Sequence, residues 1–200
     1  MSAEFFKALE NRRSVYVISK ESPIDDTKIQ HIVEEAIKHT PSSFNSQSAR
    51  AVVLLGEQHD KLWNITTETL RGIVNNEEVF KATEEKMGLF KNGYGTVLFF
   101  EDTDIITNLQ NQFEAYKDNF PLWGQQANGM LQLVVWTALE AEGLGATLQH
   151  YNPVIDEEVK STWNIPAQWQ LVAQMPFGTP AAPAGEKTYQ PVEERVKVYK

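Results

Sequence analysis

The clearest hydrophobic pattern in the chain lies between Asp25 and Thr40. Apolar residues there recur every three or four positions, at Ile29, Ile32, Val33, Ala36 and Ile37. This spacing is typical of a helix that buries one face. Asp25 is a good N-cap, and Pro41 favours an end of the helix at the preceding residue. The pattern therefore predicts a helix from about 25 to 40.

Similar spacing predicts helices along the rest of the chain. We expect them at 2–11, twice within 58–90, at 105–116, at about 122–142 and at 156–163. In the helix at 105–116, Phe113 and Tyr116 are predicted to face inward. Gly143 and Gly145 follow the long helix and are typical of a helix end.

Short apolar runs between these helices predict buried strands. They lie at 51–55, 96–100, 146–148 and 170–175. Residues 193–199 are a candidate fifth strand, with Arg195 and Lys197 on one face. Strands that alternate with helices predict an α+β or α/β sandwich.

Two stretches suggest contact with another chain. Residues 119–139 carry no charge, yet they contain too many polar residues for a membrane span. They predict a helix buried nearly all round, either at the centre of the protomer or in an interface. The stretch 176–191 is rich in Gly and Pro, and we expect it to wrap a partner chain rather than to pack on its own.

Composition limits the function classes. The chain has 200 residues, 42% of them hydrophobic and 22% charged, which suggests one domain. A net charge of −9 argues against a general nucleic-acid partner. The absence of cysteine excludes disulfides, thiolate nucleophiles and Cys-based metal sites. No signal peptide is evident at the N-terminus, and we expect a cytoplasmic protein without a membrane partner.

Candidate chemistry is concentrated in neutral and basic segments. Residues 41–47, Pro-Ser-Ser-Phe-Asn-Ser-Gln, combine hydrogen-bond donors and acceptors that suit a polar heteroaromatic ligand, although an ordinary turn would use the same residues. Arg12, Arg13 and Ser14 could bind a phosphate, or the two arginines could simply complement a helix C-terminus.

Side-chain catalysis has little support. His150 alone among the histidines follows a buried strand, and no Gly-x-Ser-x-Gly elbow, P-loop or zinc motif is present. Glu101, Asp102 and Asp104 could hold a divalent cation, but an acidic helix start is the better interpretation. The residues favour a phosphorylated cofactor that carries its own chemistry.

The order of these segments resembles the nitroreductase family of flavin enzymes. The resemblance rests on 12–14 (Arg-Arg-Ser), 41–47, 143–147 (Gly-Leu-Gly-Ala-Thr) and 195–197 (Arg-Val-Lys), which span nearly the whole chain. Residues 93–102 and 148–153 look like the branch that contains the fungal Frm2/Hbn1-type proteins and the bacterial CinD.

The resemblance implies an α+β fold with a central mixed five-stranded sheet flanked by helices, in an intertwined homodimer with FMN at the subunit interface. It implies one domain over 1–200, with 176–200 as an extended C-terminal arm. The cofactor-binding residues would be Arg12, Arg13, Ser14, Ser42, Ser43, Asn45, Gln47, Leu148, Gln149, His150, Arg195 and Lys197. Ser42, Ser43 and Asn45 would serve the partner's FMN.

The implied activity is reduction of nitroaromatics, quinones or similar acceptors by ping-pong hydride transfer from NADH or NADPH, in the context of oxidative or metal stress. Phe44, Trp123 and Tyr151 would line the acceptor's place, no side chain would be a catalyst, and no metal would be needed. Tyr16 departs from the family, which often has Lys or Arg there, and Lys86 and Lys91 are candidates for further flavin contacts. This departure leaves open an alternative, a flavin-binding regulatory or stress-sensing module with little turnover.

Overall fold

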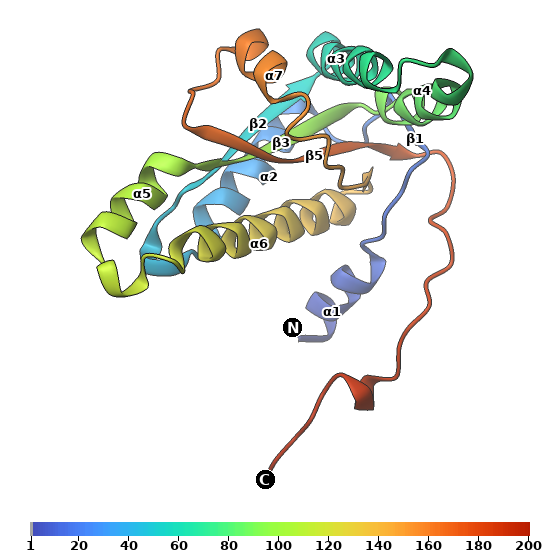
Figure 1. The fold of residues 1–200 in the computed structure, drawn as a ribbon. Coiled ribbons are helices and arrows are strands. Elements are labelled where there is room, and N and C mark those ends of the chain that lie inside the picture. The colour runs from blue at the N-terminus through green and yellow to red at the C-terminus, as the bar shows by residue number, and fades with distance from the viewer. Residues whose placement is uncertain (1) are drawn as a thin grey trace.

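A computed structural model describes residues 2–200 (Figure 1). The strands are β1 (Ile18–Ser19), β2 (Ala49–Leu55), β3 (Gly95–Asp102), β4 (Gly145–Ala146) and β5 (Trp169–Pro180). The helices are α1 (Ser2–Asn11), α2 (Asp26–His39), α3 (Glu57–Val74), α4 (Glu77–Lys91), α5 (Thr103–Gln112), α6 (Phe120–Ala141) and α7 (Asp156–Trp163). Short 3-10 turns are η1 (Ser43–Asn45), η2 (Glu114–Tyr116) and η3 (Val192–Glu194).

The strands form one five-stranded sheet in the order β1-β5-β3-β2, with β4 also paired to β5. Every pairing between these strands is antiparallel. The described residues also contain an isolated parallel bridge, Ser14 to Ala146, which lies outside the strand pairings. The predicted α+β class and five strands are confirmed, whereas the sheet is antiparallel rather than mixed.

Helices cover both faces of the sheet, as Figure 1 shows. In β3, Val97 and Phe99 point into the cluster that contains α2 and α6. Leu98 and Phe100 point the other way, into the cluster with α3, α4 and α7. Burial on both faces explains why this strand is a continuous apolar run rather than an alternating one.

Helix α6 lies close to β3 at its N-terminal half. A Cβ atom at Gly124 would come within 2.8 Å of Glu101 Oε1 and 3.0 Å of Ile106 Cδ1. One turn further on, the buried Asn128 donates from Nδ2 to the Phe100 carbonyl at 2.9 Å and to Glu101 Oε2 at 3.2 Å. Helix and strand are thus joined by polar bonds inside an otherwise apolar layer.

The face of α6 that does not pack on the sheet is apolar and exposed. Leu122, Met130, Leu133 and Val134 are exposed in the protomer. Helix α1 packs on α6 and leaves Phe5 and Phe6 exposed as well. The prediction of a helix buried nearly all round therefore holds for one face only within a single chain, and its interface alternative stays a prediction.

Three predictions about secondary structure are wrong. Residues 193–199 form no strand but a short turn and an exposed tail, and the fifth strand is Ile18–Ser19 instead. Phe113 and Tyr116 lie after α5 and are exposed. Strand β5 continues to Pro180, so the arm begins at 181 rather than at 176.

Within residues 2–200, no helix has both the length and the apolar character that crossing a membrane requires.

A buried hydrogen-bond network around His59 joins α3 to β3 and to the end of α4. His59 Nε2 donates to the Lys91 carbonyl at 3.2 Å, which leaves Nδ1 to accept from Thr96 Oγ1 at 2.8 Å. The Thr96 oxygen also accepts from Trp63 Nε1 at 3.0 Å. Burial lowers the pKa of His59 from 6.5 to about 4.

The contrast between Gly124 and Gly129 tests the packing of α6. Gly124→Ala should lower the free energy of unfolding by about 1–3 kcal/mol, because the new methyl group overlaps Glu101. Gly129→Ala should leave it unchanged or raise it by up to about 1 kcal/mol, because its Cβ meets no atom within 4 Å and alanine favours helix. Denaturant unfolding of both variants measures the difference; equal stability would contradict this packing.

The hydrogen-bond network around His59 predicts a loss of stability in acid. The folded state holds His59 neutral, so the unfolded state binds the extra proton as the pH falls from 6.5 towards 4, and the stability present above 6.5 is lost in that window. His59→Gln should reduce the decline in unfolding free energy between pH 7 and pH 4.5 by about 2–3 kcal/mol. Denaturant melts at both pH values check this, with substitution of the exposed His31 as the control; a decline unaltered by His59→Gln would refute it.

Candidate active site

The polar loop 41–47 has an unusual backbone. Thr40 ends α2 and its hydroxyl donates back to the Ala36 carbonyl at 2.7 Å. Beyond it, Phe44, Asn45 and Gln47 all have positive φ, at 57°, 50° and 49°. Left-handed backbone is uncommon outside glycine and destabilises each non-glycine residue. Three such residues in one loop therefore require interactions that hold the loop in place.

Some of these interactions come from within the loop. The Gln47 N–H donates to Ser42 Oγ at 2.9 Å, and the Asn45 N–H donates to the Ser42 carbonyl at 3.0 Å. In contrast, the side chains of Ser43 and Asn45 make no hydrogen bond to any other described residue. The turn is closed from inside, and its side-chain amide and hydroxyl groups remain available to a ligand.

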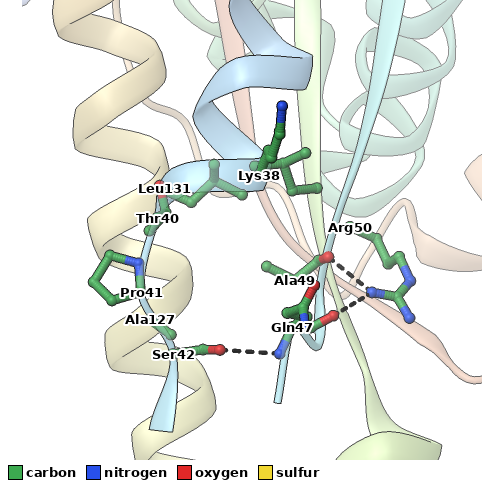
Figure 2. A pocket seen from close by; sticks show the side chains of 10 residues that line it. Lys38, Thr40, Pro41, Ser42, Gln47, Ala49, Arg50, Ala127 and Leu131 are labelled. Carbon is green, nitrogen blue, oxygen red and sulfur yellow. Dashed lines mark hydrogen bonds between the residues drawn. The ribbon is translucent and has the colours of Figure 1, made fainter. Parts of the chain in front are cut away.

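A pocket of about 340 Å³ lies beside this loop. Figure 2 shows Pro41 and Ser42 on the side of Ala127 and Leu131 of α6, with Gln47, Ala49 and Arg50 on the opposite side. Arg50 donates to the carbonyls of Gln47 and Ala49 at 2.6 and 3.0 Å. Its guanidinium also pairs with Asp102 at 3.0 Å, so this charge is neutralised within the wall of the pocket.

The Arg12, Arg13 and Ser14 segment follows α1 and is attached to the sheet by its last residue. Ser14 bridges Ala146 in parallel, and the next N–H, of Val15, donates to the Ala146 carbonyl at 2.9 Å. The Arg12 guanidinium lies 4.4 Å from the centre of the Trp136 ring. Burial, then the neighbouring charge of Arg13, lowers the pKa of Arg12, which marks a place where an anion would be favourable.

The segment after β4 presents open N–H groups. The Gln149 N–H donates to the Gln174 carbonyl at 2.7 Å, and the Tyr151 N–H donates to Gln174 Oε1 at 2.7 Å. The alternate N–H groups, of Leu148 and His150, have no acceptor within residues 2–200. Ser14 and Gln149 thus attach the arginine segment and 148–150 to the same side of the sheet, through Ala146 and through Gln174 of β5.

The basic tail does not lie beside the arginine segment or residues 148–150 of its own chain. Arg195 and Lys197 are exposed on the arm that runs away from the sheet in Figure 1. Arg13 contacts this arm through a 2.5 Å hydrogen bond from Nη2 to the Gly185 carbonyl. A phosphate site built from all four cations is therefore not assembled within one protomer.

Two of the three predicted acceptor-lining residues meet in an aromatic cluster. The Phe44 and Trp123 rings stack with centroids 6.2 Å apart. Phe44 also contacts Phe113 at 4.8 Å, Phe120 at 5.3 Å and Tyr116 at 5.9 Å. Sequence reasoning assigned no site role to these three, although the density of aromatic residues between 113 and 123 was a usable signal.

The third residue, Tyr151, lies elsewhere. Its ring packs edge-on against Trp63 at 6.0 Å, and burial, with a smaller effect of Tyr16, raises its pKa to about 12. The Tyr16 ring lies 6.3 Å from Phe90, whose ring also lies 4.9 Å from the Trp63 ring and 5.8 Å from the Lys86 ammonium. Lys91 instead donates to Asn64 at 2.7 Å.

A second pocket, which we call the α6–β5 pocket, has a volume of about 430 Å³. It lies where the first half of α6 faces the start of β5 and the segment after β4. Its lining is mostly neutral and polar: Gln125, Gly129, Gln132, His150, Asn152, Gln170, Leu171 and Val172.

The acidic residues after β3 do not form a metal site. Asp102 caps α5 by accepting from the Asp104 N–H at 3.2 Å and pairs with Arg50, while Glu101 faces Asn128. Across 2–200 no three His, Asp or Glu side chains are placed to hold a metal ion together. The acidic helix start is the interpretation that the structure supports.

Comparison with known sequences gives a consistent family. A model described as "Nitroreductase family" matches residues 9–179. The protein HBN1 of Saccharomyces cerevisiae is 41% identical over 189 residues, which are 94% of this chain and 93% of that protein. The nitroreductase FRM2 of the same yeast is 32% identical over 202 residues, covering 99% and 98%.

Solved structures agree. Nitroreductase CinD from Lactococcus lactis, in complex with nicotinic acid, superposes with a TM-score of 0.92 at 45% identity, covering 98% of this chain and all of that one. Other structures of CinD contain chloramphenicol and 4-nitrophenol. The resemblance to this branch is confirmed by both yeast proteins and by CinD.

Proposed function

We propose that this chain, which belongs to the nitroreductase family of oxidoreductases, is an FMN-dependent enzyme that uses NADH or NADPH to reduce nitroaromatic, quinone or similar acceptors. The observation that carries the proposal is the sheet edge at which Ser14, directly after Arg12 and Arg13, bridges Ala146, and at which Leu148 and His150 further along leave N–H groups without an acceptor among the described residues. This edge offers cations for a phosphate and donors for a ring nitrogen within one protomer.

The residues fit FMN in kind and in position. Guanidinium groups bind phosphate bidentately, and a nearby negative charge would favour the charged form of Arg12, whose pKa burial and then the Arg13 charge lower. The Leu148 and His150 N–H groups suit N5 of the flavin, which is a hydrogen-bond acceptor when oxidised. When bound, FMN supplies the redox chemistry, taking a hydride from the nicotinamide and giving it to the acceptor.

The chain's own residues then bind and orient rather than exchange protons. The open side chains of Ser43 and Asn45, with Ser42 and Gln47, provide a neutral wall for the flavin. Phe44 and Trp123 provide flat surfaces on which a nitroaromatic ring could stack. The ligands of CinD, chloramphenicol and 4-nitrophenol, are of this class.

A second copy of the chain would complete the site. In one protomer the loop 41–47 and its aromatic cluster form one group, and the arginines with 148–150 form another. The exposed apolar faces of α1 and α6 suit a homodimer in which the two groups come from different protomers.

The tail fits the same dimer. Among residues 2–200, β2 pairs only with β3, so its outer edge is unpaired. From Arg195 to Val198, basic and apolar side chains alternate, which is the pattern of a half-buried strand. We therefore place the tail of one protomer against β2 of its partner, which would bring Arg195 and Lys197 to the dimer's cofactor sites and explain why they form no strand in a single chain.

An absorbance spectrum tests the proposed activity. The purified protein, reconstituted with FMN, should show the visible flavin absorption, lose it on anaerobic addition of NADH or NADPH, and regain it when 4-nitrophenol or a quinone is added. A colourless protein that stays inactive with added FMN would refute the proposal. Bound FMN that NAD(P)H does not reduce would instead favour the regulatory module that Tyr16 suggests.

The loop assignment has its own test. Asn45→Ala should lower the amount of FMN that co-purifies with the protein several-fold, because it removes an open amide from the flavin wall. Asn64→Ala is the matched control, since Asn64 lies on α3 and bonds only to Lys91. Flavin content measured after denaturation gives the ratio; equal content in the two variants would count against the loop.

A further inference from the structure

Two chains of side-chain amides end at the α6–β5 pocket, and each chain begins at a backbone group. A backbone carbonyl can only accept and a backbone N–H can only donate. An amide side chain must therefore turn its NH₂ group towards a backbone carbonyl and its oxygen towards a backbone N–H. The orientation of every later amide in the chain follows from the first.

The first chain begins at the Phe100 carbonyl. Asn128 must present its NH₂ group there, at 2.9 Å, so its Oδ1 faces away. Gln132 Nε2 donates to that oxygen at 2.8 Å. Gln132 lines the pocket, is 93% buried, and its Oε1 has no donor among the described residues. The chain ends in an unpartnered acceptor.

The second chain begins at the Tyr151 N–H. Gln174, which is fully buried, accepts this proton with Oε1 at 2.7 Å, so its NH₂ group faces the other way. Gln174 Nε2 donates to Asn152 Oδ1 at 3.4 Å. The NH₂ group of Asn152 has no acceptor in the described part of the chain. This chain ends in a free donor at the same pocket.

We propose that the α6–β5 pocket binds an aromatic carboxamide, whose N–H donates to Gln132 Oε1 and whose carbonyl accepts from Asn152 Nδ2. A carboxamide offers one donor and one acceptor side by side, which is the complement of the two amide ends. A carboxylate would place a second acceptor against Gln132 Oε1. Neither the carboxylate oxygen nor Gln132 Oε1 would then receive a hydrogen bond from the other, and leaving polar atoms unpaired inside a pocket costs free energy.

The remaining lining suits a flat ring. Leu171 and Val172 supply apolar contact, and Gly129 presents bare helix backbone with no atom within 4 Å of its Cβ position. The pocket also contains His150, whose N–H belongs to the proposed flavin contact. The carboxamide's role in turnover rests on the proposed function, whereas its binding does not.

Binding of two unreactive probes tests the site. We expect benzamide to bind the full-length protein at least about fivefold more tightly than N,N-dimethylbenzamide, which has no amide proton. Gln132→Met should abolish this ratio, and Glu101→Gln should keep it, because the Phe100 carbonyl alone fixes Asn128. Titrations followed by NMR of ¹⁵N-labelled protein give both affinities and report shifts of the Gln132 and Asn152 side-chain amides.

Further variants separate the outcomes. Gln126→Met, at an exposed position on α6 outside the pocket, should leave the ratio unchanged. Gly129→Leu should weaken both probes by filling the pocket, while the protein stays folded. The same ratio in wild type and Gln132→Met, or no binding of benzamide to wild type, would overturn the proposal.

Nicotinamide as a third probe identifies the source of the group. Binding tighter than that of benzamide points to the nicotinamide of the electron donor, and equal binding points to an amide-bearing acceptor; both outcomes support the site. Because no probe is reduced, binding is measured without turnover: a protein without flavin that still prefers benzamide would refute the proposed function and support the site.

Discussion

The burial of β3 on both faces and its pairing on both edges is the constraint from which the rest of the structure follows. Its side chains supply the centre of both hydrophobic clusters, and its last residues reach the candidate site. The Asp102 N–H donates to the Ser48 carbonyl at 2.9 Å, directly after the polar loop, and the Asp102 carboxylate pairs with Arg50. Two residues earlier in β3, the Phe100 carbonyl accepts a hydrogen bond from Asn128 of α6. The loop and the amide chain of α6 are thus fixed to the same strand.

Most of the fold could be predicted from the sequence because its strongest signals are local. The spacing of Ile29, Ile32 and Val33, the cap at Asp25 and the stop at Pro41 each act within a turn or two of helix, and α2 appears within a residue of the prediction. The errors fall where the partner of a segment is distant. Residues 193–199 have the alternation of a strand, but a strand needs a neighbour, and this protomer provides none for them.

The aromatic residues before α6 show a second limit of periodicity. Phe113 and Tyr116 continue the spacing of α5, yet the helix ends at Gln112 and the chain turns. Their rings then pack on Phe44, a residue of the polar loop some seventy positions earlier. Periodicity predicts which face of a helix is apolar, but it cannot identify what covers that face. In the site, likewise, residue types favoured a phosphorylated cofactor and the family resemblance implied FMN, whereas the open ends of the amide chains follow only from the three-dimensional structure.

The strained loop shows how these constraints produce a preformed site. Each left-handed non-glycine residue costs about 1–2 kcal/mol, although asparagine tolerates this backbone better than phenylalanine does. Single internal hydrogen bonds contribute only about 1 kcal/mol each, so the two Ser42 contacts alone do not offset this cost. The part-buried Arg50–Asp102 pair, two further Arg50 bonds to the Gln47 and Ala49 carbonyls and the packing of Phe44 in its aromatic cluster supply the remainder. Because these interactions hold the backbone from inside the protomer, Ser43 and Asn45 can keep their polar groups open without the loop collapsing onto them. A ligand that bonds to these groups would therefore meet an ordered wall, and less of its binding free energy would be spent on ordering the loop.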